Sequence, residues 1–136
     1  MPVDPRRALG AAGEARAAAW YRAHGYRVVA QNWRCREGEI DLVATRRGVL
    51  VVVEVKTRRT DRFGSPAEAV TRAKQQRLRR LAVRFLQETG ARPRSIRFDV
   101  VAILGGRLEV IESAFLAPAG AGQRRGARPA PTRIAA

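Results

Sequence analysis

Residues 38–57 read GEIDLVATRRGVLVVVEVKT, and this stretch predicts a β-hairpin. Two apolar runs rich in β-branched residues, Glu39–Ala44 and Val49–Thr57, have the composition of strands. Between them Arg47 and Gly48 suit a two-residue turn that ends in glycine. The hairpin is the first element that the sequence indicates.

Three charged residues interrupt these apolar strands: Asp41, Glu54 and Lys56. The run Val49–Val53 is typical of a strand that is buried on both faces. A carboxylate or an ammonium group in such a place needs a partner of opposite charge or a metal ion, because an unpaired buried charge is costly. We therefore interpret the three residues as a candidate site.

The two-residue turn also predicts which side chains face one another across the hairpin. Given that turn, Asp41 faces Glu54, and Glu39 faces Lys56. Facing carboxylates repel unless a cation lies between them, and Mg²⁺ is commonly held by one or two carboxylates. A shift of one residue in register would instead turn Asp41 to the opposite face of the sheet.

The basic residues are divided very unequally between arginine and lysine. Of 27 basic residues, 25 are Arg, and only Lys56 and Lys74 are Lys. A lysine is a compact charge that can lose its proton beside a water molecule or a phosphate, whereas an arginine effectively cannot. Either such chemistry or chance would leave a lysine at position 56.

Asp41 followed by Glu54-x-Lys56 resembles the PD-(D/E)xK nuclease signature, with Ile40 in the position of the proline that names the motif. The chain is more closely similar to the small bacterial YraN-like proteins, which are relatives of archaeal Holliday junction resolvases. The similarity spans about residues 10–104, and its blocks are Gly10-x-x-Gly13-Glu14, Gly38-Glu39-Ile40-Asp41-Leu42, Val53-Glu54-Val55-Lys56-Thr57-Arg58, Phe63-Gly64-x-Pro66-x-Glu68-Ala69-Val70 and Arg97-Phe98-Asp99-Val100-Val101.

This resemblance implies an α/β fold of the restriction-endonuclease-like type, a three-layer sandwich around a mixed sheet. It implies that Asp41 and Glu54 hold Mg²⁺ or Mn²⁺, and that Lys56 orients the attacking water or stabilises charge on the phosphorus. It places Glu14 in the helix-borne acidic position that supplements the metal site. The alternative for Glu14 is a solvated side chain that pairs with an arginine of its own helix. Branched DNA as substrate, and a homodimer that brings two sites together, follow from the resolvase relatives alone.

The remaining patterns complete the predicted order αβββαββ. Before the hairpin we expect a helix from Asp4-Pro5 to about His24 and a strand Arg27–Trp33. After it we expect a second helix, which follows the capping box Ser65-Pro66-Ala67-Glu68, includes the apolar residue 70 and ends at Gly90. The last elements are a strand Ile96–Leu104, a turn Gly105-Gly106 and a strand Leu108–Ile111. This order predicts one domain over residues 1–116. The tail 117–136, which is rich in Ala, Arg, Pro and Gly, cannot bury a core and is expected to be disordered.

The net charge of +15 points to a polyanionic partner, nucleic acid before an anionic membrane. Residues 117–136 hold four Arg and no acid, which leaves 23 basic and 12 acidic residues, or +11, on the folded part. The alternative is solubility charge in an arginine-biased chain. A start without an apolar signal segment, no run of membrane-spanning length, and a single cysteine, Cys35, predict a cytoplasmic protein that does not partner a membrane.

Four basic residues are candidates for DNA backbone contacts: Arg58 and Arg59 directly after the hairpin, and Lys74 and Arg77 on the second helix. The alternative for each is solvated charge. Asp99, alone in an apolar strand, is expected to be the buried ion-pair partner of an arginine.

The expected function is a metal-dependent endonuclease that hydrolyses DNA, with branched recombination or repair intermediates as the substrate class that the resemblance implies. Two alternatives remain at this point. One is a nucleic-acid-binding protein without catalysis, in which the acidic cluster is structural or vestigial. The other is a basic partner protein of a DNA uptake or repair assembly.

Overall fold

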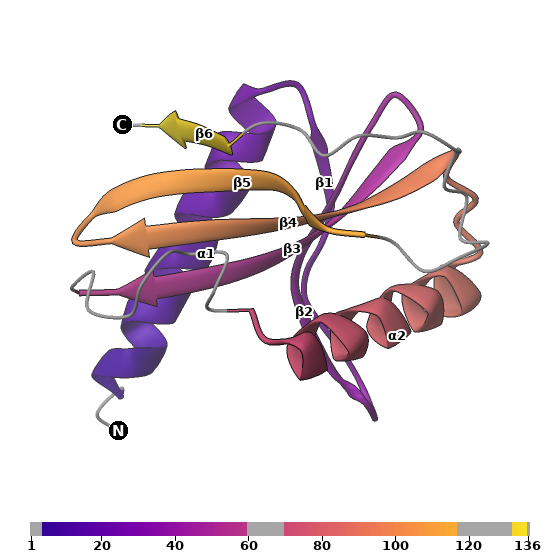
Figure 1. The fold of residues 1–136 in the computed structure, drawn as a ribbon, viewed down its shortest axis with the longest axis horizontal. Helices are drawn as coiled ribbons and strands as arrows, with labels where there is room; N and C mark the ends of the chain where they lie inside the picture. Colours follow the sequence, from indigo (N-terminus) through magenta and orange to yellow (C-terminus); the bar gives the residue numbers. More distant parts are fainter. Residues whose placement is uncertain (1–3, 60–69, 117–131, 136) are drawn as a thin grey trace.

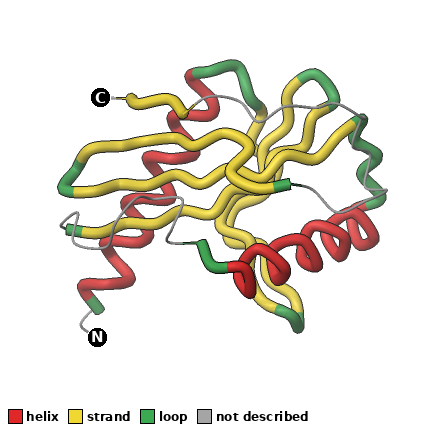
Figure 2. The backbone as a smooth tube through the Cα atoms, viewed as in Figure 1, coloured by secondary structure: helices red, strands yellow, loops and turns green. Residues whose placement is uncertain are grey.

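The computed structural model describes residues 4–59, 70–116 and 132–135. Within these residues a mixed six-stranded sheet of order β1-β2-β3-β4-β5-β6 carries a helix on each face (Figures 1 and 2). Only β3 and β4 are parallel, and α2 lies between them in the sequence. The bounds are α1 Pro5–Ala23, β1 Arg27–Cys35, β2 Gly38–Arg46, β3 Val49–Arg58, α2 Arg72–Thr89, β4 Ser95–Leu104, β5 Arg107–Phe115 and β6 Thr132–Ala135. This is the predicted three-layer α/β sandwich of the restriction-endonuclease-like type.

The hairpin of β2 and β3 has the predicted turn and register. Arg47 and Gly48 both have positive φ angles, 50° and 80°, as a two-residue hairpin turn of the primed type requires. The pairs run from Arg46 opposite Val49 to Leu42 opposite Val53. The register that the turn implied is therefore confirmed along these pairs.

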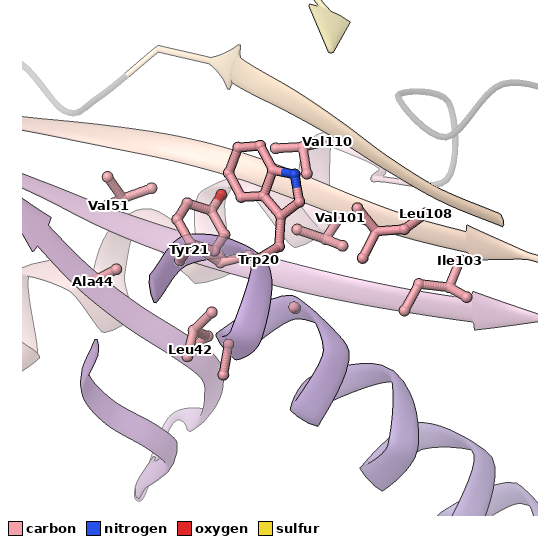
Figure 3. Packing of buried hydrophobic residues seen from close by; sticks show 12 residues of the cluster. Trp20, Tyr21, Leu42, Ala44, Val51, Val101, Ile103, Leu108 and Val110 are labelled. Carbon is pink, nitrogen blue, oxygen red and sulfur yellow. The ribbon is translucent and has the colours of Figure 1, made fainter. Parts of the chain in front are cut away.

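The two helices bury opposite faces of the sheet, and β3 contributes to both cores. Trp20 and Tyr21 of α1 pack on the face that includes Val51 and Val53 (Figure 3). Leu50 and Val52 point to the other face, against the α2 residues Leu78, Leu81, Ala82 and Phe85. The prediction of a strand buried on both sides is confirmed. Across the described ranges, neither helix has the long apolar run needed to cross a membrane.

Gly13 lets α1 approach the sheet closely. A Cβ atom built at this position would overlap the Thr57 hydroxyl of β3, so an alanine would force the helix or the strand to shift. Gly10, one turn earlier, has no atom within 4 Å of such a Cβ. Of the two helix glycines, only Gly13 is explained by packing.

Two predictions about element ends are wrong. Val70 lies outside α2, because the helix begins at Arg72 with Thr71 as its N-cap, whose hydroxyl accepts from the Lys74 backbone N–H at 3.2 Å. The proposed capping box at 65–68 lies outside the described residues. Thr132–Ala135 forms β6 on the edge of β5 and is not disordered, since an open strand edge offers backbone partners even to a short segment.

Candidate functional site

The regular alternation of β2 breaks at Asp41. Ile40 packs in the cluster beneath α2, whereas Leu42 packs in the cluster beneath α1, although residues two apart in a regular strand share a face. Opposite Asp41 on β1, Asn32 has a positive φ angle of 52°. The β2–β3 ladder stops at Leu42, and the β1–β2 hairpin extends beyond the other strands toward α2 (Figures 1 and 2).

The carboxylate of Asp41 lies in the place where this ladder ends. Its Oδ2 accepts a hydrogen bond from the backbone N–H of Val55 at 2.8 Å. At this position of β3, the acceptor is therefore the Asp41 side chain and not a backbone carbonyl of β2. Burial and then the charge of Glu54 raise the pKa of Asp41 to about 7, against the opposing effect of the Val55 hydrogen bond. The charge of Glu54 therefore acts on Asp41, although the predicted facing pair Asp41–Glu54 lies one step beyond Leu42 opposite Val53, the last pair of the ladder.

Glu54 is buried, with 4% of its surface exposed, and it is the meeting point of both lysines of the chain. Its Oε1 lies 3.3 Å from the Lys56 Nζ and 3.2 Å from the Lys74 Nζ. Lys56 is two residues along the same strand, and Lys74 reaches across from the first turn of α2. Lys56 therefore lies beside the acidic centre, as predicted, and Lys74 contacts the same oxygen of Glu54.

Two further acids border this centre. Burial raises the pKa of Glu14, and the negative charges of Glu39 and Glu54 raise it further. A hydrogen bond with Asn32 acts in the opposite direction. The charges of Glu39 and Glu54 thus act on Glu14, while Arg16, one candidate partner on its own helix, donates to the carbonyl of Gly106 at 2.6 Å. Glu39 forms an ion pair of 3.6 Å with Arg34 on β1. Its expected pairing with Lys56 is absent, because the β2–β3 ladder has already ended.

The acids fit a divalent cation as a pair. Among the residues that the structure describes, no three His, Cys, Asp or Glu side chains lie close enough together to hold a metal ion. The three-ligand set of Asp41, Glu54 and Glu14 is therefore not assembled in this structure. The half-buried Asp41 and the buried Glu54 still form a mutually repelling pair, which suits a hard cation that takes one or two carboxylates and keeps its remaining waters.

The other basic candidates lie apart from this centre. Arg58 and Arg59 line a cavity of about 320 Å³ together with Gly13 and Arg16 of α1, on the opposite side of β3 from Glu54. Arg58 also donates to the Thr57 carbonyl at 3.0 Å. Arg77 is exposed, beside the backbone of Gly38 at the start of β2. Of the four predicted DNA contacts, only Lys74 reaches the acidic centre.

Asp99 is the buried ion-pair partner that the sequence predicted. Its two oxygens accept from Arg97 at 2.9 Å each, and it also accepts from the Tyr21 hydroxyl at 2.6 Å and the Ser113 N–H at 3.0 Å. This network connects α1, β4 and β5. It satisfies a side chain that is only 1% exposed, so the role of Asp99 is structural.

Sequence reasoning missed two parts of the site. Asn32 was given no role, although asparagine is one of the few residues that readily adopt a positive φ angle. Lys74 was assigned to the helix surface, although it is the only lysine besides Lys56, and that rarity was the signal available.

Comparisons with known proteins agree on the family. The family model described as "Uncharacterised protein family UPF0102" matches residues 13–103. A UPF0102 protein of Symbiobacterium thermophilum is 53% identical over 114 residues, which cover 80% of this chain and 97% of that protein. A UPF0102 protein of Beutenbergia cavernae is 56% identical over 100 residues, covering 74% and 85% respectively. This chain therefore belongs to the UPF0102 family, whose members are the YraN-like proteins.

Proposed function

We propose that this protein is a metal-dependent endonuclease that hydrolyses phosphodiester bonds in DNA. The observation that carries the proposal is the pair of a half-buried carboxylate, Asp41, and a buried one, Glu54, at the point where β2 and β3 separate, with the Lys56 ammonium 3.3 Å from Glu54. Carboxylates whose pKa is raised by burial and by a second carboxylate are common at catalytic sites.

Asp41 and Glu54 are the residues that would hold the ion. Burial and then the charge of Glu54 raise the pKa of Asp41 to about 7, and a cation between the two carboxylates would offset both effects by favouring their charged forms. Bound there, Mg²⁺ or Mn²⁺ would lower the pKa of a water molecule and neutralise charge on the scissile phosphate.

Lys56 is placed to act on the phosphate side of the same centre. Its ammonium is held by Glu54 and its side chain is 24% exposed, so it can reach solvent and a bound backbone. A fixed positive charge there stabilises negative charge that develops on the phosphate oxygens. Glu14, whose pKa burial raises, borders the site and would support the second coordination sphere.

The charge of the chain favours a nucleic acid as the substrate. Residues 1–116 carry a net charge of +11, which supplies sequence-independent attraction to the phosphate backbone. Arg58, Arg59 and Arg77 add to this attraction from positions outside the acidic centre. Branched recombination or repair intermediates as substrates, and a homodimer, rest on the resolvase resemblance and remain predictions.

The test is cleavage of branched, single-stranded and duplex DNA in Mg²⁺ or Mn²⁺ by the wild type and by the variants Glu54→Ala and Lys56→Ala. We expect the wild type to cleave, and both variants to bind DNA but lose cleavage by at least about 100-fold, as removal of charge-stabilising groups commonly does. Equal cleavage by all three proteins would assign the activity to a contaminant or to another site.

One observation favours a second function, that of a DNA-binding protein without catalysis. Glu54 already has two ammonium partners, so its charge is compensated without a metal ion. This alternative predicts tight, salt-sensitive DNA binding by the wild type and no cleavage of any substrate in either metal.

A further inference from the structure

The two lysines of this chain converge on one oxygen atom. Lys56 and Lys74 are the only lysines among 27 basic residues, and both ammonium groups lie within 3.3 Å of the Glu54 Oε1. Random retention of two lysines on an arginine-rich surface gives no reason for both to contact the same buried carboxylate. The shared contact therefore points to a common role for the two ammonium groups at Glu54.

Lys74 occupies an unfavourable place for a cation. It lies in the first turn of α2, which contains no acidic residue, and the N-terminus of a helix carries partial positive charge. The contact with Glu54 offsets this repulsion and ties the start of α2 to β3. Among the residues that the structure describes, Glu54 is the carboxylate that pairs with Lys74, and this contact weakens when Glu54 gains another positively charged partner.

The choice of lysine suits such a release. All five other basic residues of α2 are Arg, so the helix tolerates arginine wherever surface charge is sufficient. An ammonium group makes a single point contact on a flexible chain, whereas a guanidinium group prefers a fixed two-pronged pair with a carboxylate. The Lys74 side chain is 30% exposed, so it can swing into solvent without opening the core.

We propose that Lys74 and a divalent metal ion compete for Glu54. In the free protein the ammonium neutralises the carboxylate, and the ion displaces it, which makes the ammonium available to a phosphate of bound DNA. An ion that coordinates Glu54 at about 2.1 Å brings two positive charges against an ammonium that shares the same carboxylate. Lys56 is fixed two residues away on the same strand, whereas Lys74 belongs to another element and can leave. This inference rests on the metal site of the proposed function.

The ammonium signals of the two lysines allow a direct test by nuclear magnetic resonance. In protein labelled with ¹⁵N-lysine only two side-chain signals exist, and the variant Lys74→Arg removes one of them and so assigns both. On titration with Mg²⁺ without DNA, we expect the Lys74 signal to move to the position of a solvated lysine. In Glu54→Gln that signal should start near the solvated position and should not respond to Mg²⁺.

Calorimetry of Mn²⁺ binding supplies a second readout, with a matched control on the same helix. Lys74→Met removes the competing ammonium, and we expect Mn²⁺ to bind about two- to fivefold more tightly, the range of a partly exposed ion pair. Arg80→Met removes an exposed charge from α2 and should leave the affinity unchanged within experimental error.

The outcomes separate this inference from the nuclease proposal. One outcome would refute the competition and leave the metal site standing. In it, Asp41→Asn abolishes Mn²⁺ binding, but the Lys74 ammonium signal does not change with the ion, and Lys74→Met and Arg80→Met bind Mn²⁺ with the same affinity. If no ion binds the wild type, both ideas fail. If the ion displaces Lys74 but no DNA is cleaved, the competition stands and the nuclease proposal fails.

Discussion

Replacing Asp41 with Asn should stabilise the protein above neutral pH in the absence of divalent metal. Asparagine keeps the shape of the side chain and an oxygen that accepts from the Val55 N–H, which Asp41 contacts at 2.8 Å. It removes the negative charge that is buried beside Glu54. The substitution therefore isolates the free energy of holding that charge in the folded state.

The magnitude follows from the pKa of Asp41, which burial and Glu54 raise from 3.8 to about 7. The pKa of Asp41 is higher in the folded than in the unfolded protein, so protonation of this acid favours folding. Its contribution to the free energy of unfolding is fully present below pH 3.8. It is lost as the pH rises through 7, since the folded protein must then hold the charged form. A shift of roughly three units corresponds to about 4 kcal/mol, and partial solvent access reduces the expected gain of Asp41→Asn to about 2–4 kcal/mol at pH 8.5.

The assay is urea unfolding at pH 4, 6, 7 and 8.5 with a chelator present, comparing the wild type, Asp41→Asn and Glu88→Gln. Glu88 is an exposed acid paired with Arg84 on α2, so its substitution should change the stability by less than about 0.5 kcal/mol at every pH. Addition of Mg²⁺ should stabilise the wild type and not Asp41→Asn. If Asp41→Asn shows no gain at pH 8.5, or the same gain at pH 4, the carboxylate is not destabilised by its surroundings and our reasoning is wrong.

Four substitutions test the packing around the site by thermal or urea unfolding. Asp99→Ala removes the ion-pair partner of the half-buried Arg97 and the acceptor of the buried Tyr21 hydroxyl and should cost about 3–5 kcal/mol, and a cost below 1 kcal/mol would contradict the network. Gly13→Ala should destabilise by about 1–3 kcal/mol because the new Cβ overlaps Thr57, whereas Gly10→Ala should stabilise by up to about 1 kcal/mol; equal effects would refute the close helix approach. Thr71→Ala removes the α2 cap and should cost about 1 kcal/mol, and an unchanged stability would exclude that cap.

The central hairpin could be predicted from the sequence because its signals are local. The Arg47-Gly48 turn fixes the register, and the register places Leu42 opposite Val53. The end of the ladder could not be predicted in this way. It depends on the bend of the β1–β2 hairpin toward α2, and on Asp41 replacing a backbone partner of Val55.

The start of α2 and the strand β6 were predicted wrongly for a related reason. The sequence signal for a cap was at Ser65, whereas the cap in the structure is Thr71, whose backbone is extended with φ −66° and ψ 163°. The preceding Val70 packs against Val100 and Ile111, a contact that local sequence signals do not reveal. The pairing of Thr132–Ala135 depends on a free edge of β5, which composition cannot reveal.

The acidic centre was predicted in part. Period-two alternation is enough to place Glu54 and Lys56 on one face. The contribution of Lys74 depends on how α2 is rotated against β3, which a helical periodicity does not specify. The sequence shows which face of α2 is apolar, but the neighbour of each polar residue is set by the packing of the whole layer.

The most direct test of the account is the anomalous scattering of Mn²⁺ in crystals of the protein. We predict one strong peak within coordination distance of both Asp41 and Glu54, and its loss in crystals of Asp41→Asn. A peak elsewhere with this pair vacant, or no peak at saturating Mn²⁺, would contradict the claim that these two carboxylates form a cation site.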